Sequence, residues 1–193
     1  NRSDPAYDGK LAFYDAEEEV CVGVLVFAER YRRLEKKMAV QEKDPCRKVE
    51  LTAISRVLAR VPAQPASSFH EALQMVWLMQ LIPQIESNGF SISLGRLDQY
   101  CWPYLKADLA AGTITLEQAQ ELLDLLWLKF CEILRVDSRD AAEVNAGYYV
   151  AGQNIEVGGV DRGGHDCTNL LSYLCLNANR HIQLHQPNFT IRL

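Results

Sequence analysis

The stretch Glu86-Ser-Asn-Gly-Phe-Ser-Ile-Ser-Leu-Gly-Arg-Leu-Asp-Gln-Tyr-Cys-Trp-Pro-Tyr104 places a polar, glycine-containing sequence between two strongly apolar segments. Helical spacing of apolar residues predicts a helix before it, over 69–80, and another after it, over 116–134. A loop held between two such helices, in which Gly89 and Gly95 can adopt a positive φ, is well placed to line a pocket. The polar side chains available to this pocket segment are those of Asn88, Ser91, Arg96 and Asp98.

With its apolar positions set aside, residues 86–100 read Glu-Ser-Asn-Gly-x-Ser-x-Ser-x-Gly-Arg-x-Asp-Gln-Tyr, which resembles the pocket segment of the glycyl radical enzymes. The resemblance is to the branch that is similar to pyruvate formate-lyase and includes glycerol dehydratase-like enzymes. Further strings match in family order and at family spacing: Val61-Pro62, Phe69 to Gln74, Leu126 to Lys129, Gly152 to Asn154, Gly158-Gly159, Asp166 to Asn169 and Gln186-Pro187. The resemblance covers nearly the whole chain.

The resemblance implies an internal segment of one large domain of the pyruvate formate-lyase type. The expected fold is mostly α with a few β-strands, corresponding to the helical wall and the first strands of the α/β barrel of that family. Residues 1–145 are expected to be helical, and residues 146–193 to form a strand, a helix and a strand. The first residue is not Met, and the chain stops directly after a predicted strand, which also favours a piece of a longer protein.

Composition excludes several other classes. The chain has 193 residues, 48% of them hydrophobic and 23% charged, and its net charge is −5. These values are typical of a soluble globular protein. No Lys/Arg stripe indicates nucleic-acid binding, and no apolar run is long enough for a membrane span or signal peptide, so we expect a cytoplasmic protein. The six cysteines show no paired C-x-x-C spacing, which indicates neither zinc nor a disulfide framework.

Local signals predict the remaining helices. Apolar spacing predicts one or two helices over 8–39, with a candidate break at 14–17, and Pro45 begins a helix to about residue 60. Ser68 and Glu71 predict a capping box for the helix over 69–80, which Pro83 is expected to end or kink. Thr115 and Gln118 predict a second capping box for the helix over 116–134. A short helix interrupted by Pro103 is expected over 99–110, and a charged connection over 136–145.

The residue composition changes after Gly147. β-branched and aromatic residues predict strands over 153–157 and 188–193, and Asp166 or Thr168 is expected to cap a helix between them that runs to about residue 180. A strand, a helix and a strand in this order predict a parallel pair joined by a crossover.

The resemblance also implies the chemistry. Enzymes of this family cleave C–O, C–N or C–C bonds of small polar substrates with a protein glycyl radical, which an S-adenosylmethionine iron–sulfur activating enzyme installs. They bind no other cofactor, and a homodimer is expected. The family's Cys-x-Glu motif and its C-terminal radical glycine are both absent from this sequence. The chain is therefore expected to be inactive alone, with no catalytic residue and no metal site.

The resemblance also implies roles for individual residues. Phe90 and Ser91, directly after Asn88-Gly89, correspond to positions that meet substrate. A serine hydroxyl can donate to and accept from a substrate hydroxyl or carboxylate, whereas phenylalanine offers an apolar or cation-facing wall. Supporting roles are expected for Asn88, Gly89, Arg96, Asp98, Gln153 and Asn154. Strand alternation allows only one of Gln153 and Asn154 to face inward.

Two other functions stay open. One is a true pyruvate formate-lyase, which transfers an acyl group to coenzyme A. The other belongs to a different class: a non-catalytic helical interaction module, in which the apolar helix over 116–134 binds a partner.

Overall fold

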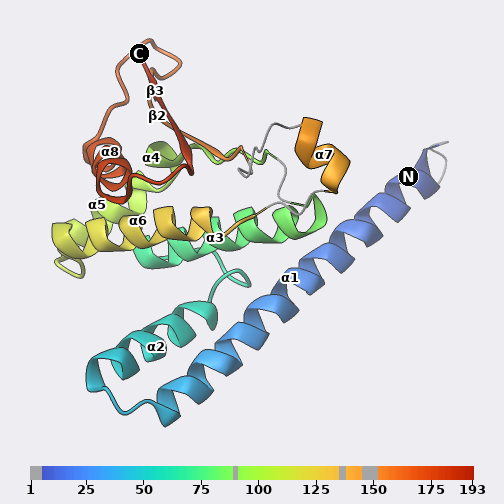
Figure 1. Ribbon diagram of the computed structural model, residues 1–193, viewed down its shortest axis with the longest axis horizontal. Coiled ribbons are helices and arrows are strands. Elements are labelled where there is room, and N and C mark those ends of the chain that lie inside the picture. Colours follow the sequence, from blue (N-terminus) through green and yellow to red (C-terminus); the bar gives the residue numbers. More distant parts are fainter. Residues whose placement is uncertain (1–5, 89–90, 135–137, 145–151) are drawn as a thin grey trace. The chain divides into compact units, whose positions relative to one another are not determined.

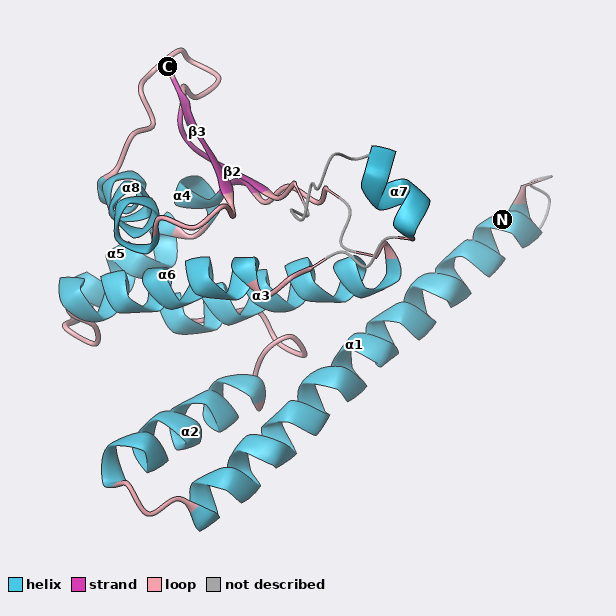
Figure 2. Cartoon of the chain, viewed as in Figure 1, coloured by secondary structure: helices cyan, strands magenta, loops and turns pink. Residues whose placement is uncertain are grey.

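The computed structural model describes residues 6–88, 91–134, 138–144 and 152–193. The chain divides into two compact units, Asn1–Pro65 and Ala66–Leu193. Helices make up most of both units, and every strand among the described residues belongs to the second unit (Figure 2). The expectation of a mostly helical chain with a few strands is confirmed.

The first unit is a hairpin of two antiparallel helices, α1 (Tyr7–Gln41) and α2 (Pro45–Leu58), as Figure 1 shows. Asp44 caps α2 by accepting from the backbone N of Cys46, and Pro45 occupies the first turn, where no N–H is needed. The Ser55 Oγ donates to the carbonyl of Arg32 at 3.2 Å and so joins the two helices. Because α1 runs unbroken through residues 14–17, the region forms one helix and not two.

The second unit packs three long helices and a short one around a shared core: α3 (Phe69–Glu86), α5 (Trp102–Ala111), α6 (Leu116–Cys131) and α8 (Leu170–Ile182). Helix α6 lies against both α3 and α8 (Figure 1). Its inward side chains include Leu123, Trp127 and Phe130, all fully buried. Burying each such side chain contributes about 1.5–3 kcal/mol, so α6 is the central helix of this unit.

Three short parallel strands complete the second unit in the order β1 (Gly95–Arg96), β2 (Asn154–Gly158) and β3 (Asn188–Arg192). Strand β2 pairs with β3 from Asn154↔Asn188 to Gly158↔Arg192, and α8 is the crossover between them. The predicted parallel unit is therefore confirmed. Strand β1 was not predicted, because two residues are too few for an alternation pattern.

Several helix ends differ from the prediction. Helix α3 continues through Pro83 to Glu86, so Pro83 does not end it. Helix α6 ends at Cys131, three residues before the predicted end, where the backbone N of Glu132 turns back to the carbonyl of Lys129. The short helical region after the pocket segment is two helices, α4 (Leu97–Tyr100) and α5, and the charged connection contains α7 (Arg139–Val144).

The helix caps were predicted in part. Thr115 and Gln118 form the predicted capping box of α6. Ser68 caps α3, but the Glu71 carboxylate accepts from the backbone N and the Oγ of Ser67, one residue before the cap. Helix α8 is capped by Asn169, in a box with Ser172, and neither Asp166 nor Thr168 is its cap. The Asp166 carboxylate instead binds the backbone N and the Oγ of Thr168.

Candidate functional site

From Ser91 onward, the pocket segment runs along the edge of the sheet. The backbone N of Leu94 donates to the carbonyl of Asn154 at 2.9 Å, and Gly95 and Arg96 then pair with Ile155 and Glu156. This edge pairing holds the segment beside β2. Two residues to which the sequence assigned roles, Gly89 and Phe90, lie outside the described residues.

Ser91 lies in an unusual backbone conformation, with a φ of +46°, and nearby Asn88 has a φ of +55°. Asparagine tolerates this region better than serine does. Gly152, at the entry to β2, approaches Ser91 so closely that an added Cβ would lie 2.7 Å from the Ser91 Oγ. A side chain at position 152 would therefore displace the Ser91 hydroxyl and would be strained by the φ of +67° at Gly152.

Of the two candidate residues at the start of β2, Gln153 faces the helices of the second unit. Its side chain is fully buried, and its Nε2 donates to the carbonyl of Phe130, at the end of α6, at 2.9 Å. Asn154 is half-buried, and its Oδ1 accepts from the Thr190 Oγ1 on β3. Gln153 and Asn154 therefore lie on opposite faces of the strand, as strand alternation predicts.

Asp98 is fully buried and joins three elements of the second unit. Its Oδ2 accepts from the backbone N of Gly158 at 2.8 Å and from the Ser172 Oγ at 2.5 Å. The Asn169 Nδ2 donates to the Asp98 backbone carbonyl at 3.0 Å. The carboxylate therefore fixes α4 to the end of β2 and to the first turn of α8.

Arg96 points elsewhere. Its Nη1 donates to the carbonyl of Val160 at 3.2 Å, and no ion pair joins it to Asp98 among the described residues. Its Nε and Nη2 are buried and have no hydrogen-bond partner in the part of the chain that the structure describes. Arg96 and Asp98 therefore make separate contacts, with the Val160 carbonyl and with the backbone N of Gly158 respectively.

Three of the cysteine thiols, those of Cys101, Cys131 and Cys175, are poorly suited to redox or nucleophilic chemistry. Burial raises the pKa of Cys101 to about 12 and that of Cys175 well above the usual value. Burial also raises the pKa of Cys131, whose Sγ donates to the carbonyl of Gln186 at 3.1 Å. Because the thiolate is the reactive form, a raised pKa makes these side chains packing residues.

His70 is half-buried in the first turn of α3. Burial lowers the pKa of His70, so desolvation favours its neutral form. No group of three or more His, Cys, Asp or Glu side chains among the described residues could hold a metal ion.

None of the described helices is both long and apolar enough to cross a membrane.

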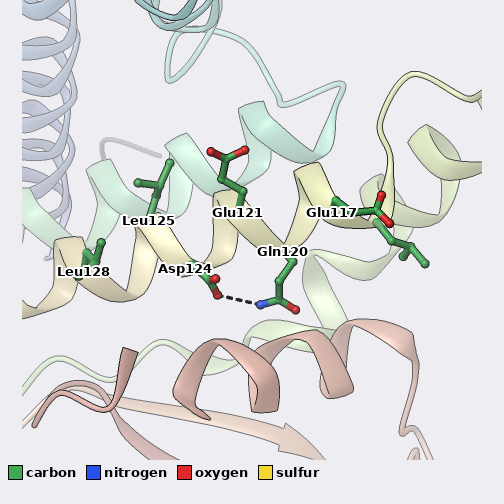
Figure 3. Close-up of a pocket in the computed structure, with 7 residues that line it drawn as sticks. Glu117, Gln120, Glu121, Asp124, Leu125 and Leu128 are labelled. Carbon is green, nitrogen blue, oxygen red and sulfur yellow. Dashed lines mark hydrogen bonds between the residues drawn. The ribbon is translucent and has the colours of Figure 1, made fainter. Parts of the chain in front are cut away.

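A separate groove of about 480 Å³ runs along the exposed side of α6 (Figure 3). Glu117, Glu121 and Asp124 line it with three leucines of the same helix. The Gln120 Nε2 donates to Asp124 Oδ1 at 2.8 Å, and the other Asp124 oxygen lies 3.0 Å from His181 Nδ1. Two of the lining residues, Gln120 and Asp124, thus bind each other. The groove shares no lining residue with the pocket segment.

Comparison with known proteins identifies several relatives of this chain. Isethionate sulfite-lyase from Nitratidesulfovibrio vulgaris is 37% identical over 186 residues, which cover 95% of this chain and 22% of the relative. A solved structure concerning 1,2-propanediol dehydration in Roseburia inulinivorans is 42% identical with a TM-score of 0.94, over 100% of this chain and 24% of that one. A glycyl radical enzyme from Archaeoglobus fulgidus is 35% identical with a TM-score of 0.90, over 98% and 24% respectively.

The chain spans about a quarter of the length of these relatives. Its sequence matches the family described as pyruvate formate lyase-like over residues 1–193. The chain therefore belongs to the pyruvate formate lyase-like family of glycyl radical enzymes.

Proposed function

We propose that this chain is an internal segment of a glycyl radical lyase or dehydratase, which cleaves a C–O, C–N or C–C bond of a small polar organic substrate. The observation that carries the proposal is the placement of Ser91. It lies in a pocket-segment sequence of this family, at the edge of a parallel sheet, with Gly152 against its hydroxyl. In this proposal the Ser91 hydroxyl and the Phe90 ring contact substrate.

The segment's own contribution is binding and orientation. A hydroxyl that both donates and accepts can fix one polar substrate group before a hydrogen atom is removed from the neighbouring carbon. The glycyl radical supplies the radical chemistry, and we propose that an S-adenosylmethionine-dependent activating enzyme installs it outside this segment. A homodimer is part of the same proposal.

One experiment separates this function from its alternatives. The full-length protein that contains this chain is activated anaerobically and assayed with 1,2-propanediol, glycerol, isethionate, and pyruvate with coenzyme A. Product from 1,2-propanediol or glycerol supports a dehydratase that cleaves a C–O bond, product from isethionate shows a lyase that cleaves a C–S bond instead, and acetyl-coenzyme A supports a pyruvate formate-lyase. A protein that acquires no glycyl radical signal in electron paramagnetic resonance would favour the helical interaction module.

Purified alone, the 193-residue chain is expected to show no turnover and no glycyl radical after the same activation. The reason is that its sequence contains neither a Cys-x-Glu motif nor a radical glycine of the Arg-Val-x-Gly-Tyr type. Electron paramagnetic resonance checks this directly. A glycyl radical signal on the isolated chain would contradict the assignment of both radical positions to other parts of the protein.

Ser91→Ala in the full-length enzyme is expected to lower kcat/KM roughly tenfold with little change in Tm, because it removes one hydrogen bond worth about 0.5–1.5 kcal/mol. Ser93→Ala is the matched control, since Ser93 is exposed in the same segment. Steady-state kinetics and thermal unfolding measure the two effects. Equal kinetics for both variants would remove Ser91 from the substrate contacts.

A further inference from the structure

A single side chain from α3 connects the pocket segment to the interior of the second unit. The Gln80 Nε2 donates to the carbonyl of Ile92 at 2.8 Å and to the Gln153 Oε1 at 2.9 Å. Gln80 is 2% exposed and Gln153 is completely buried. The two amide hydrogens of Gln80 therefore bind different segments: one binds the pocket segment at Ile92, and the other binds Gln153, directly before β2.

This contact continues the sheet where backbone pairing stops. Residues 94–96 pair with 154–156 through the backbone. Closer to Ser91, the Gln80 side chain bridges the two segments, because its Nε2 donates to both the Ile92 carbonyl and the Gln153 Oε1. Ile92 is the residue directly after Ser91. The position of the Ile92 peptide therefore influences where the Ser91 hydroxyl lies.

Gln153 is itself held on several sides, so Gln80 is bonded to a rigid partner. The Gln153 Nε2 donates to the carbonyl of Phe130 at 2.9 Å, its backbone N donates to the Gln186 Oε1 at 3.2 Å, and its carbonyl accepts from the backbone N of Asn188 at 2.8 Å. A buried polar network in which the amides are bonded in this way rigidifies its surroundings.

Burial of a glutamine on α3 does not by itself produce such a bond. Gln84 lies one turn after Gln80 on the same helix and is 3% exposed, yet its Nε2 and Oε1 have no hydrogen-bond partner among the described residues. The two glutamines thus share residue type, helix and burial, and differ in the bonds they make. Gln84 is a matched control within the same helix.

We propose that Gln80 is a positioning residue of the active site, which fixes the Ile92 carbonyl to Gln153 and thereby sets the Ser91 hydroxyl against Gly152. The inference rests on the proposed function of Ser91. Catalytic and binding groups must be held within about 0.5 Å of their productive positions, and a displacement of about 1 Å can lower the rate about a hundredfold. A methionine at position 80 would fill the same space without donating a hydrogen bond.

The test compares Gln80→Met with Gln84→Met in the full-length enzyme, with kcat expressed per glycyl radical counted by electron paramagnetic resonance. Gln80→Met is expected to lower kcat per radical about ten- to a hundredfold. Gln84→Met should leave it within about twofold of the parent, since no bond in the described region is lost. Counting radicals removes the effect of any enzyme that fails to fold, so a purely structural role would leave kcat per radical unchanged.

Hydrogen exchange without substrate supplies a second readout that does not depend on activity. The Leu94 amide, bonded to Asn154, should exchange about tenfold faster in Gln80→Met and at the parent rate in Gln84→Met. If the parent enzyme turns over no substrate, the proposed function fails while the exchange result still reports the Gln80 contact. Parent-like kcat per radical in Gln80→Met would overturn the inference.

If Gln80→Met does not accumulate as folded enzyme, Gln80→Asn replaces it. Asparagine keeps the amide but is one methylene shorter, so it cannot reach both acceptors. The same loss of kcat per radical and the same faster exchange at Leu94 are expected. Parent-like values of both quantities would again overturn the inference.

Discussion

Gly152→Ala is expected to lower kcat/KM of the full-length enzyme about a hundredfold. The added Cβ would lie 2.7 Å from the Ser91 Oγ, so the hydroxyl, its backbone, or the start of β2 must move. Gly152 also has a φ of +67°, where a side chain costs about 1–2 kcal/mol. A displacement of the order of 1 Å at a group that orients substrate is enough for a hundredfold loss.

Gly164→Ala separates the two causes. Gly164 has a φ of +79°, but an added Cβ would meet nothing within 4 Å. This control therefore carries the backbone penalty without the contact at Ser91, and its kcat/KM should stay within about twofold of the parent. Kinetics with the radical content measured in parallel checks both variants. Equal, small losses would show that the close approach of Gly152 to Ser91 has no role in catalysis.

The second large effect is expected on stability. Asp98→Ala should lower the free energy of unfolding by about 3 kcal/mol, because a hydrogen bond to a charged group contributes about 1.5–3 kcal/mol and the variant leaves buried donors on Gly158 and Ser172 without their acceptor. For a chain of this size, each kcal/mol shifts Tm by about 2–4 °C, so a drop of about 6–12 °C is expected. Thermal unfolding followed by circular dichroism measures it.

Asp98→Asn is the matched control for the charge. The amide oxygen can occupy the place of Oδ2 and accept from Gly158 and Ser172, while its NH₂ occupies the position of Oδ1, which has no partner in the described region. Roughly half of the Asp98→Ala loss is expected. A double-mutant cycle with Arg96→Ala should show only weak coupling, because no ion pair joins the two residues, although both bond the segment 158–160. Strong coupling would contradict the separate contacts described for them.

Most helices could be predicted from the sequence because their signals are local. The Thr115 cap, the start of α2 at Pro45 and the apolar periodicity of α6 each depend on residues within a few positions of one another. Where two signals compete locally, prediction fails more readily. The sequence predicted Asp166 or Thr168 as the cap of α8, yet Asp166 binds Thr168, and Asn169 takes the cap. Three such residues within four positions offer similar local chemistry.

Family resemblance, carried by the strings around the pocket segment, also identified Ser91, Asp98 and Gln153 as residues of interest. Only the tertiary structure decided what each of them contacts. The bond from Gln80 to Gln153 joins residues 73 positions apart, and the bond from Ser172 to Asp98 joins residues 74 apart.

The sequence by itself determined most of the helices, the parallel strand unit and the family, because periodicity, capping and motif strings lie in short stretches of chain. The tertiary structure decided the two-residue strand β1, the contact of Gln153 with α6, the separation of Arg96 from Asp98 and the approach of Gly152 to Ser91. These features depend on which distant segments the packing brings together. A hydrogen bond between such segments requires its donor and acceptor to come within about 3 Å, a distance that no local pattern specifies.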